Sequence, residues 1–447
     1  MDSGEFRTFE EESQRNNMID LEAEKNKKVT ALLIGEPGVD LGELRGLVDT
    51  LGLETVRAVS LTRREITPAY GMGKGKAEEL SALAEELSAD VIIFDFEIDP
   101  RKQRNWEKLS KRPVFDRQEV ILRIFADRAQ TKEATLQVQL ARLEYSLPRL
   151  AHSYGDMARQ RGGNFGSKGS GETQLELDMR EIREKIRLVK KELKQVVKDR
   201  ETQRKRRESV PIPTCALVGY TNAGKSSLLN ALTGADVFIE DKLFATLDPT
   251  TRKMQLQNGA NILLTDTVGF ISNLPHSLVN AFKSTLEEAE RADLVLLVLD
   301  SSDEKIEFQY STVTRVLEEI NADKSPRIIV LNKIDKLLER GDGEIVLAKL
   351  NSLFPGNVKV SAKTREGFGT LTEKISETLM GREKDYIIPT DKAGILSEAR
   401  KTGFIIEENW LDDGVHVKMK SGGLSSNARL EALIAEYENG SGGGENG

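Results

Sequence analysis

The first part of the chain alternates short apolar runs with stretches that place leucines at helical spacing. The apolar runs predict strands at 29–34, 55–61 and 91–94. The leucine-bearing stretches predict helices over 41–51 and 76–87. Strands that alternate with helices in this way indicate a parallel sheet. We therefore expect residues 29–113 to form an N-terminal α/β domain, preceded by a polar, disordered leader at 1–28.

Two longer stretches carry apolar residues at alternating spacings of four and three. The first comprises Leu136, Leu140, Leu143, Leu147 and Leu150. The second comprises Leu175, Met179, Ile182, Ile186, Val189, Leu193 and Val196. Such seams predict two long helices, and the short chain between them makes the pair antiparallel. We expect this helical hairpin to span 114–209, with Pro148 kinking or ending its first helix.

Strands and helices alternate again in the second half of the chain. Apolar runs predict strands at 215–218, 262–264, 294–299, 327–331 and 358–360. We expect a doubly wound, mostly parallel sheet in a domain at 210–380. A shorter pattern of strands, with one helix over 393–401, predicts a small C-terminal α/β domain at 385–437. The Gly-rich end at 438–447 is expected to be a flexible tail.

Composition narrows the class of protein. The net charge of −8 over 447 residues argues against nucleic-acid attraction by the whole chain, so any basic surface must be local. The single cysteine, Cys215, cannot form an internal disulfide and is expected in the core, and the three histidines show no metal-ligand spacing. No apolar run approaches membrane-spanning length. We expect a cytoplasmic monomer without membrane insertion, and peripheral membrane association stays open.

A glycine-rich loop follows the strand at 215–218 and opens a helix. Its sequence runs Gly219-Tyr-Thr-Asn-Ala-Gly-Lys-Ser226, the full G-x-x-x-x-G-K-S spacing. The glycines let backbone N–H groups surround phosphate oxygens, Lys225 brings a positive charge, and Ser226 brings a hydroxyl for Mg²⁺. The alternative, a chance glycine-rich turn, is disfavoured by the strand-loop-helix context. The predicted nucleotide contacts here are Gly219, Tyr220, Thr221, Asn222, Ala223, Gly224, Lys225, Ser226 and Ser227.

Two further segments complete the predicted phosphate and Mg²⁺ site. Asp266 ends an apolar strand and can hold Mg²⁺ through water, while the N–H of Gly269 can reach a γ-phosphate. A threonine upstream would complete the metal site. The run Asp248-Pro249-Thr250 resembles a run found in known GTPases and favours Thr250 for this role, with Thr246 as the alternative.

The base-binding residues are predicted to follow the next two strands. Asn332-Lys333-Ile334-Asp335 ends the strand at 327–331. The carboxylate of Asp335 can accept hydrogen bonds from guanine N1–H and the 2-amino group, a donor pair that adenine lacks. Lys333 would pack along the base, and Ser361-Ala362-Lys363 would support guanine O6. The motifs together predict a GTP- and GDP-binding enzyme with Mg²⁺.

Two other glycine-rich segments carry positive charge. Gly71 to Lys76 precedes a helix and either is an ordinary loop or holds phosphate, which would make a second site for ATP. The predicted hairpin tip at 159–172 lies in a basic stretch, since residues 159–209 hold 16 Lys and Arg against 9 Asp and Glu, net +7. A flexible turn needs fewer residues, so we expect an RNA contact. Its residues would be Arg159, Arg161, Gly162, Gly163, Asn164, Phe165 and Lys168.

The chain resembles the HflX family of ribosome-associated GTPases over nearly all of 29–430. The resemblance rests on three segments: Arg161-Gly162-Gly163 through Gly169-Ser170-Gly171-Glu172-Thr173-Gln174-Leu175-Glu176, Phe244-Ala-Thr-Leu-Asp-Pro-Thr250 and the loop 219–226. It implies binding to the large ribosomal subunit, with the hairpin tip at ribosomal RNA near the peptidyl-transferase centre. It also implies the splitting of stalled ribosomes under stress such as heat, GTP hydrolysis, and in some members ATP hydrolysis.

Lys225, Gly269 and Asn222 are the candidate catalytic residues. The position after Gly269, where many GTPases carry a water-orienting glutamine, holds Phe270, so we expect slow hydrolysis until a partner completes the site. Asn222 matches a position that binds K⁺ in a related GTPase group, and the alternative is that it only caps a turn. The competing function is a GTP-switched adaptor that binds RNA or protein and regulates RNA processing or a membrane protease, without splitting ribosomes.

Overall fold

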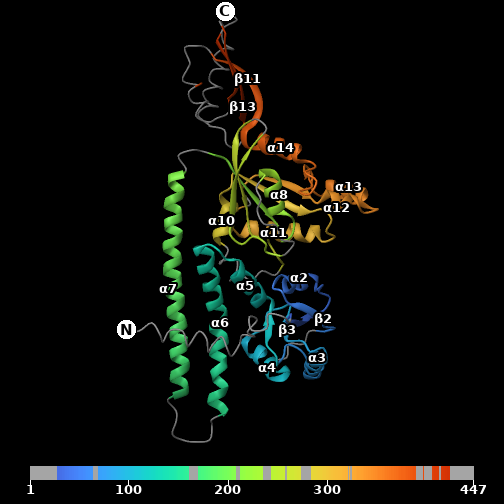
Figure 1. Cartoon of the computed structure of the whole chain (residues 1–447), viewed down its shortest axis with the longest axis vertical. Coiled ribbons are helices and arrows are strands. Elements are labelled where there is room, and N and C mark those ends of the chain that lie inside the picture. Colours follow the sequence, from blue (N-terminus) through green and yellow to red (C-terminus); the bar gives the residue numbers. More distant parts are fainter. Residues whose placement is uncertain are drawn as a thin grey trace, which may run out of the picture. The chain divides into compact units, whose positions relative to one another are not determined.

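A computed structural model describes residues 28–63, 69–160, 170–207, 212–234, 243–256, 259–272, 283–320, 322, 325–388, 396, 405–411 and 414–422 (Figure 1). The described residues divide into two compact units, one ending at Lys198 and the other beginning at Asp199. The expected tail at 438–447 and all but Lys28 of the expected leader lie outside the described residues. No helix within these ranges is both long and apolar enough to cross a membrane.

The N-terminal sheet has four parallel strands in the order β2-β1-β3-β4. The strands are β1 (Thr30–Gly35), β2 (Glu54–Ser60), β3 (Val91–Phe94) and β4 (Val114–Asp116). The helices are α2 (Gly42–Thr50), α3 (Lys74–Glu86), α4 (Pro100–Ser110) and α5 (Arg117–Arg128). Leu32, Ile92 and Phe94 are fully buried beside Trp106 of α4. The alternation of strand and helix therefore predicted the parallel sheet correctly.

The expected domain boundary at 113 is wrong. β4 pairs in parallel with β3 and completes the sheet, and Asp116 at its end caps α5 by accepting a hydrogen bond from the N–H of Glu119 at 2.9 Å. Val120, Ile121 and Phe125 of α5 are buried. The N-terminal domain therefore includes α5. A strand of three residues is too short to give a periodic signal, which is why the sequence did not reveal it.

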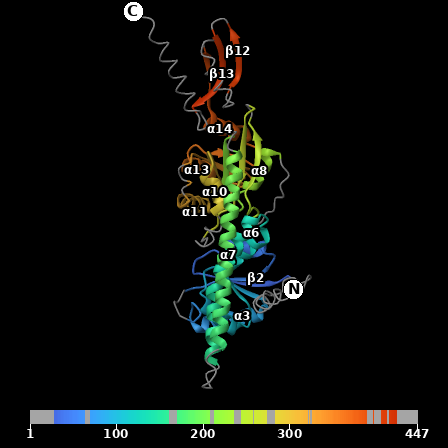
Figure 2. The same ribbon diagram turned by 90° about the vertical axis from the view of Figure 1, so that its left-hand side faces the viewer.

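The helical hairpin consists of α6 (Lys132–Gln160) and α7 (Ser170–Arg207). Lys132 pairs with Glu192 at 2.7 Å and Lys190 with Glu144 at 2.8 Å, as antiparallel helices require. On α7 the seam residue Val189 is buried, and Met179, Ile182, Ile186, Leu193 and Val196 are half-buried. Figure 2 shows α7 as one uninterrupted helix.

Two expectations about the hairpin need correction. Of the two outcomes expected at Pro148, an end of the helix is wrong, because α6 continues to Gln160. Tyr145 and Arg149, on either side of the proline, both donate hydrogen bonds to Asp116. The tip is shorter than 159–172, since α6 includes residues 159–160 and α7 begins at Ser170. The tip residues 161–169 lie outside the described residues.

α6 carries a second apolar face that the sequence analysis missed. Ala134, Val138, Ala141 and Tyr145 recur at spacings of four, three and four and are buried. This face anchors α6 to the N-terminal domain. The Tyr145 hydroxyl donates to Asp116 Oδ1 at 2.9 Å, and Arg149 Nη2 donates to Asp116 Oδ2 at 3.0 Å and to the Ile98 carbonyl at 3.2 Å. Arg149 also donates to Gln103 Oε1 at 2.9 Å and stacks over the Tyr145 ring.

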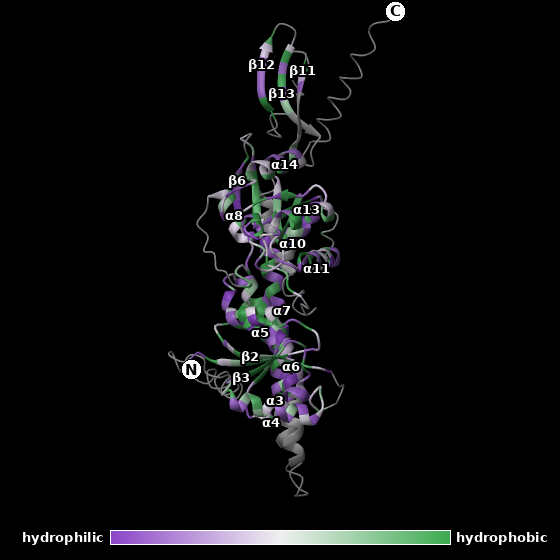
Figure 3. Ribbon diagram, turned by 90° about the vertical axis from the view of Figure 1, so that its right-hand side faces the viewer, coloured by the Kyte–Doolittle hydropathy of each residue, from purple (hydrophilic) through white to green (hydrophobic). Residues whose placement is uncertain are grey.

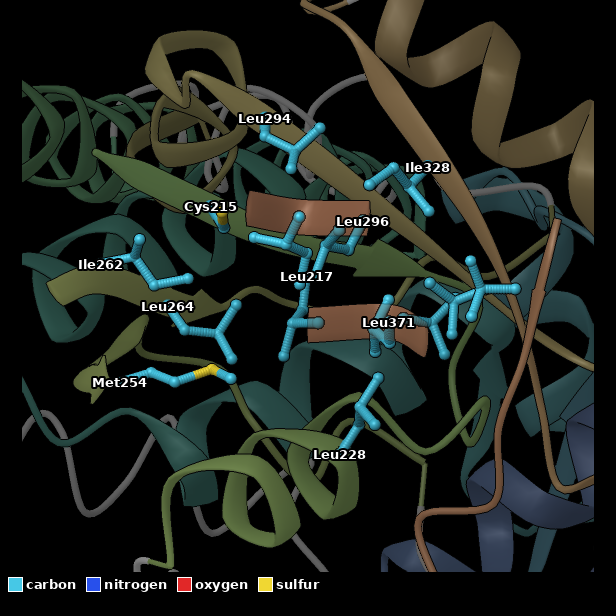
Figure 4. Close-up of a cluster of buried hydrophobic side chains, with 14 of the residues drawn as sticks. Cys215, Leu217, Leu228, Met254, Ile262, Leu264, Leu294, Leu296, Ile328 and Leu371 are labelled. Atoms are coloured by element: carbon cyan, nitrogen blue, oxygen red, sulfur yellow. The ribbon is translucent and has the colours of Figure 1, made fainter. Parts of the chain in front are cut away.

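The second unit contains a six-stranded sheet in the order β10-β9-β8-β5-β7-β6. Its strands are β5 (Thr214–Gly219), β6 (Thr250–Gln255), β7 (Asn261–Asp266), β8 (Leu294–Asp300), β9 (Arg327–Asn332) and β10 (Val358–Lys359). All neighbours are parallel except β6 and β7. Its core includes Cys215, Leu217, Leu264 and Leu296 from the strands and Leu228 from a helix (Figure 4). The mixed α/β fold class with a mostly parallel P-loop sheet is confirmed.

The helices of this sheet are α8 (Lys225–Thr233), α10 (Lys283–Arg291), α11 (Ile306–Glu319), α12 (Ile334–Leu338), α13 (Gly343–Leu353) and α14 (Phe368–Met380). The end of α7 contributes to this unit, because Arg200 Nη2 lies 2.7 Å from Glu287 Oε2 of α10. Asn332 and Asp266 close β9 and β7, so the polar residues of the predicted motifs gather at the carboxyl ends of parallel strands. Open α/β sheets bind ligands at this edge.

The C-terminal sheet has three antiparallel strands in the order β11-β13-β12: β11 (Gly381–Ile388), β12 (Ile405–Leu411) and β13 (Gly414–Gly422). β11 begins directly after α14, four residues before the expected boundary at 385. Val415, Val417 and Met419 of β13 are buried, while β12 is mostly exposed and carries both polar and apolar residues (Figure 3). The helix expected over 393–401 lies outside the described residues apart from Leu396.

Candidate functional site

The phosphate loop is shaped by two glycines at its ends. A Cβ on Gly219 would collide with the Val298 carbonyl of β8, so only glycine fits there. Gly224 has φ +89°, and a side chain there would collide with the amide of Asn332. Asn222 also adopts a positive φ, of +60°, and is exposed. Positive φ angles permit the tight backbone turn with which phosphate loops surround an anion.

Lys225, the first residue of α8, is buried within the loop. Its Nζ donates to the carbonyls of Gly219 at 3.1 Å and Tyr220 at 2.9 Å. Burial lowers the pKa of Lys225 to about 8, and the nearby Asp266 carboxylate acts in the opposite direction. A buried cation gains strongly from an anion brought next to it.

Three oxygen-bearing side chains meet beside Lys225. Ser226 Oγ donates to Asp266 Oδ2 at 2.6 Å, Thr246 Oγ1 donates to the same oxygen at 2.9 Å, and the two hydroxyls lie 2.8 Å apart. Asp266 is 1 % exposed, and burial raises its pKa against the effects of Lys225 and the two hydroxyls. The structure thus brings Ser226 and Asp266 together, as the motifs predicted.

This cluster suits a hard divalent cation. Among the described residues Asp266 Oδ1 is buried without a hydrogen-bond partner, which leaves one carboxylate oxygen for a further ligand. Those residues contain no cluster of three or more His, Cys, Asp or Glu. Mg²⁺ does not need one, because it usually takes one or two protein oxygens and completes its shell with water and substrate phosphate. The residues present therefore fit Mg²⁺.

The threonine in this cluster is Thr246 rather than Thr250. Thr250 opens β6 and is paired through its backbone register with Asp266, but no hydrogen bond places its hydroxyl beside Ser226. The expectation of Thr250 rested on the run Asp248-Pro249-Thr250 alone. Such a run does not indicate which threonine the folded chain places beside Ser226 and Asp266. A small cavity of about 50 Å³ lies between the phosphate loop, residues 244–246 and Gly269.

Gly269 and Phe270 lie against the phosphate loop in different ways. A Cβ on Gly269 would lie 2.8 Å from Thr221 Cγ2 and 3.0 Å from Lys225 Nζ, so glycine permits the close approach. Phe270 donates its N–H to the Gly219 carbonyl at 3.1 Å and accepts from the Thr221 N–H at 2.7 Å. Its ring is 2 % exposed. The Phe270 side chain therefore belongs to the core and presents nothing to the cavity that could orient water.

The base-reading residues form a second group at the ends of β9 and β10. Asn332 Nδ2 donates to the Ala223 carbonyl at 2.9 Å, and Asn332 Oδ1 accepts from the Ala362 N–H at 3.1 Å. Ser361 Oγ donates to Asp335 Oδ1 at 2.7 Å and fixes the carboxylate. The phosphate loop and the two base-reading segments are therefore joined by direct hydrogen bonds.

A cavity of about 660 Å³ opens over this group. The lining includes every predicted base contact except Ser361, and residues in and beside α8 complete it. The lining residues are Gly224, Ser227, Asn230, Ala231, Gly234, Asn332, Lys333, Asp335, Lys336, Glu339, Ala362, Lys363 and Arg365. The volume lies within the usual range of ligand pockets. Asn230, Lys336, Glu339 and Arg365 were not predicted, because no fixed spacing relates them to the motifs.

The remaining predicted sites are placed as follows. Met72 of the loop Gly71 to Lys76 is buried, and its two lysines pair with glutamates of α3, Lys74 with Glu78 at 3.4 Å and Lys76 with Glu79 at 2.6 Å. Of the predicted RNA contacts, Arg159 lies in the backbone of α6, and the others lie outside the described residues.

Three family models match the chain consecutively. They are described as GTP-binding GTPase N-terminal over 39–126, GTP-binding GTPase Middle Region over 128–207, and 50S ribosome-binding GTPase over 214–333. The first junction falls at the end of α5, in agreement with the corrected domain boundary.

Similar proteins cover nearly the whole chain. GTPase HflX of Caldanaerobacter subterraneus is 42% identical over 405 residues, which covers 90% of this chain and 92% of that one. GTPase HflX of Escherichia coli K12 is 39% identical over 383 residues, covering 85% and 89%. A crystal structure of a GTP-binding protein from Sulfolobus solfataricus in complex with GDP is 25% identical, covering 78% and 98%, with a TM-score of 0.44. The chain is a GTPase that belongs to the HflX family.

Proposed function

We propose that this GTPase binds the large ribosomal subunit and splits or rescues stalled ribosomes under stress, with hydrolysis stimulated by the ribosome. The observation that carries the proposal is the match of residues 214–333 to the model described as 50S ribosome-binding GTPase, within a chain that aligns with an HflX protein over 90% of its length. The partner site that we propose is ribosomal RNA near the peptidyl-transferase centre, contacted by the hairpin tip.

The nucleotide site would work through side chains that are already oriented. Asp335, fixed by Ser361, would accept from guanine N1–H and the 2-amino group, so an adenine base would leave the carboxylate unpaired. Lys225 would exchange its two carbonyl partners for phosphate oxygens, which satisfy a buried cation better. Ser226, Asp266 and Thr246 would hold Mg²⁺, which supplies neutralisation of the developing phosphate charge.

Slow hydrolysis by the protein alone follows from Phe270. Its ring is buried and cannot orient an attacking water, so a partner must complete the arrangement. Single-turnover GTP hydrolysis should therefore accelerate on addition of ribosomes. Equal rates with and without ribosomes would contradict this part of the proposal.

A K⁺ ion beside Asn222 is a further proposal about the same step. Asn222 is exposed, has φ +60°, and gives its backbone carbonyl to Lys333 Nζ at 2.7 Å. A cation next to the phosphates would play the part of an arginine finger. Hydrolysis should be faster in K⁺ than in Na⁺ at equal ionic strength, and the Asn222→Ala variant should lose the difference. Equal rates in the two salts would remove K⁺ from the mechanism.

The hairpin supplies local positive charge for an RNA partner. Arg180, Arg183, Lys191 and Lys194 of α7 are all exposed. By contrast, Lys185 pairs with Glu181 at 3.1 Å and Arg187 with Glu184 at 2.6 Å. Phosphate binding by such cations weakens steeply as salt rises. Arg180→Glu with Arg183→Glu should therefore reduce ribosome binding and flatten its salt dependence, whereas Lys185→Glu with Arg187→Glu should do so less, because those two charges are already paired.

The decisive experiment is sedimentation of 70S ribosomes with the full chain and either GTP, GDP or a non-hydrolysable GTP analogue. Accumulation of free subunits with a GTP-state nucleotide supports splitting. Co-sedimentation with intact ribosomes would favour the GTP-switched adaptor that regulates RNA processing or a protease. No association in any nucleotide state would overturn a ribosomal role.

ATP use at Gly71 to Lys76 stays a separate proposal with a separate test. Both lysines of this loop are paired within α3, so phosphate would have to displace glutamates. ATP turnover that survives Lys225→Ala but not Lys74→Ala with Lys76→Ala would support a second site. Turnover lost with Lys225→Ala would assign all of it to the GTP site.

A further inference from the structure

The carboxyl end of β8 holds the base-reading segment at two points. Ser301 donates both its N–H and its hydroxyl to the Asn332 carbonyl, at 2.9 and 2.7 Å. The preceding residue, Asp300, places its carboxylate 2.9 Å from the Nζ of Lys333. The same short turn thus fixes the backbone of one base-reading residue and the side chain of the next.

Asp300 is itself held rigidly. Its Oδ1 accepts hydrogen bonds from the N–H of Ser302 at 2.9 Å and the hydroxyl of Ser302 at 2.6 Å, which leaves Oδ2 for Lys333. The side chain of Asp300 is 12 % exposed and that of Lys333 is 25 % exposed. The pair is therefore largely removed from water, where a fixed carboxylate holds an ammonium group more strongly than it does on the surface.

The Lys333 ammonium joins three parts of the site. Beside Asp300 it donates to the carbonyl of Asn222 in the phosphate loop at 2.7 Å. Lys333 has φ +61° and immediately precedes α12, which carries Asp335. A lysine side chain is flexible and loses rotamer freedom when it is fixed, so a second partner is needed to hold it in one place.

We propose that Asp300 is a positioning residue for guanine nucleotide binding. By holding the Lys333 ammonium, it keeps the lysine stem along the base and keeps the phosphate loop at Asn222 in register with the base-reading loop. Asp300 touches neither base nor phosphate, so its contribution passes through Lys333. The inference rests on the nucleotide site alone, and it stands or falls independently of the ribosomal role.

The test is a double-mutant cycle on GDP affinity, measured with a fluorescent GDP analogue and the full chain. Asp300→Asn removes the charge but keeps an oxygen for Ser302, so the turn survives. We expect GDP binding to weaken about tenfold, the usual scale for losing one hydrogen bond to a charged group. In a Lys333→Ala background the same change should have almost no effect, because the partner through which Asp300 acts is gone.

A matched control lies three residues along the chain. Asp303 accepts from the N–H of Lys305 at 2.8 Å and from Gln309 Nε2 at 2.8 Å, and it touches no nucleotide-site residue through these bonds. Asp303→Asn should leave GDP affinity unchanged. The ratio of GDP to ADP affinity should also stay constant in Asp300→Asn, since Asp335 is untouched.

Two outcomes would overturn the proposal. One is an equal loss of affinity from Asp300→Asn with and without Lys333, which would assign Asp300 a purely structural role. The other is unchanged GDP affinity in Asp300→Asn. Thermal unfolding without nucleotide tells the two roles apart further, because a positioning role predicts a melting temperature close to that of the parent protein.

Discussion

Arg149 of α6 should be the residue whose loss most weakens the attachment of the hairpin to the N-terminal domain. Its guanidinium reaches Asp116, the Ile98 carbonyl and Gln103, and Asp116 is 2 % exposed. Arg149→Ala would leave this buried carboxylate without its cationic partner. Asp116 would keep the Tyr145 hydroxyl and the N–H groups of Glu119 and Ile98. The result is an incomplete shell around a buried charge.

The expected loss is about 2–3 kcal/mol of unfolding free energy. Breaking a buried ion pair from one side costs roughly 3–5 kcal/mol, because the remaining charge stays unpaired. We expect a loss below that range because three donors remain on Asp116 and the Arg149 side chain is 18 % exposed. Arg187→Ala in α7 is the matched control: Arg187 pairs with Glu184 but is 64 % exposed, so its loss should leave the free energy of unfolding almost unchanged.

The pH dependence provides a second, independent measurement. Burial raises the pKa of Asp116 above the ordinary aspartate value, and Arg149 acts against that rise. Without Arg149 the pKa of Asp116 should rise further. A carboxyl whose pKa is higher in the folded than in the unfolded chain favours the fold at low pH and loses that contribution as pH rises through the folded pKa. The deficit of Arg149→Ala should therefore be largest at neutral pH and shrink as pH falls.

Trp106 offers a local probe of this unit. It is fully buried and donates to the Tyr70 carbonyl at 3.0 Å, and the other tryptophan, Trp410, is 58 % exposed in β12. In a Trp410→Phe background, urea unfolding followed by tryptophan fluorescence reports on the N-terminal unit alone. Equal losses for Arg149→Ala and Arg187→Ala, or a deficit independent of pH, would refute the reasoning.

Three further predictions concern the nucleotide site. Thr246→Ala should raise the Mg²⁺ concentration needed for half-maximal binding of a GTP analogue more than Thr250→Ala does, since the Thr246 hydroxyl lies beside Ser226 and Asp266. A larger effect of Thr250→Ala in a Mg²⁺ titration would assign the Mg²⁺ ligand to Thr250. Asp335→Asn should weaken GTP binding at least about a hundredfold and improve binding of xanthosine triphosphate, whose base presents an acceptor where guanine has an amino group. Competition binding measures both affinities, and an unchanged preference for GTP over xanthosine triphosphate would exclude Asp335 as the base reader. Gly269→Ala should reduce affinity for the GTP analogue more than for GDP, because the added Cβ would press on Thr221; equal losses would speak against a γ-phosphate contact.

The nucleotide motifs could be predicted because their chemistry fixes both residue type and spacing. A buried phosphate requires glycines at set positions, and strands ending in Asp266 and Asn332 bring the motifs to one sheet edge. Contacts between distant segments could not be predicted in this way. The pair Asp300 and Lys333 and the choice of Thr246 depend on how the chain packs, and no local pattern encodes them.

The end of the N-terminal domain was predicted wrongly for a different reason. β4 has three residues, too few for a period, and its role as a strand comes from its neighbour β3. The second apolar face of α6 could not be predicted because the residues of the two faces alternate along the same stretch of sequence. The heptad spacing of the leucines indicates only one of these faces. Tyr145 and Arg149, which hold α6 to Asp116, are amphipathic or charged and give no sign of burial in the sequence.

The junction between the two compact units falls between Lys198 and Asp199, well inside α7. α7 has 38 residues and is roughly 57 Å long at about 1.5 Å per residue. Most multidomain proteins are joined by exposed loops, which proteases cut first. Here the joint has its backbone hydrogen bonds made within a helix, so limited proteolysis should not separate the units at this point. A fragment designed to end at residue 198 would also leave terminal carbonyls of the helix without partners, and it would need a cap to stay ordered.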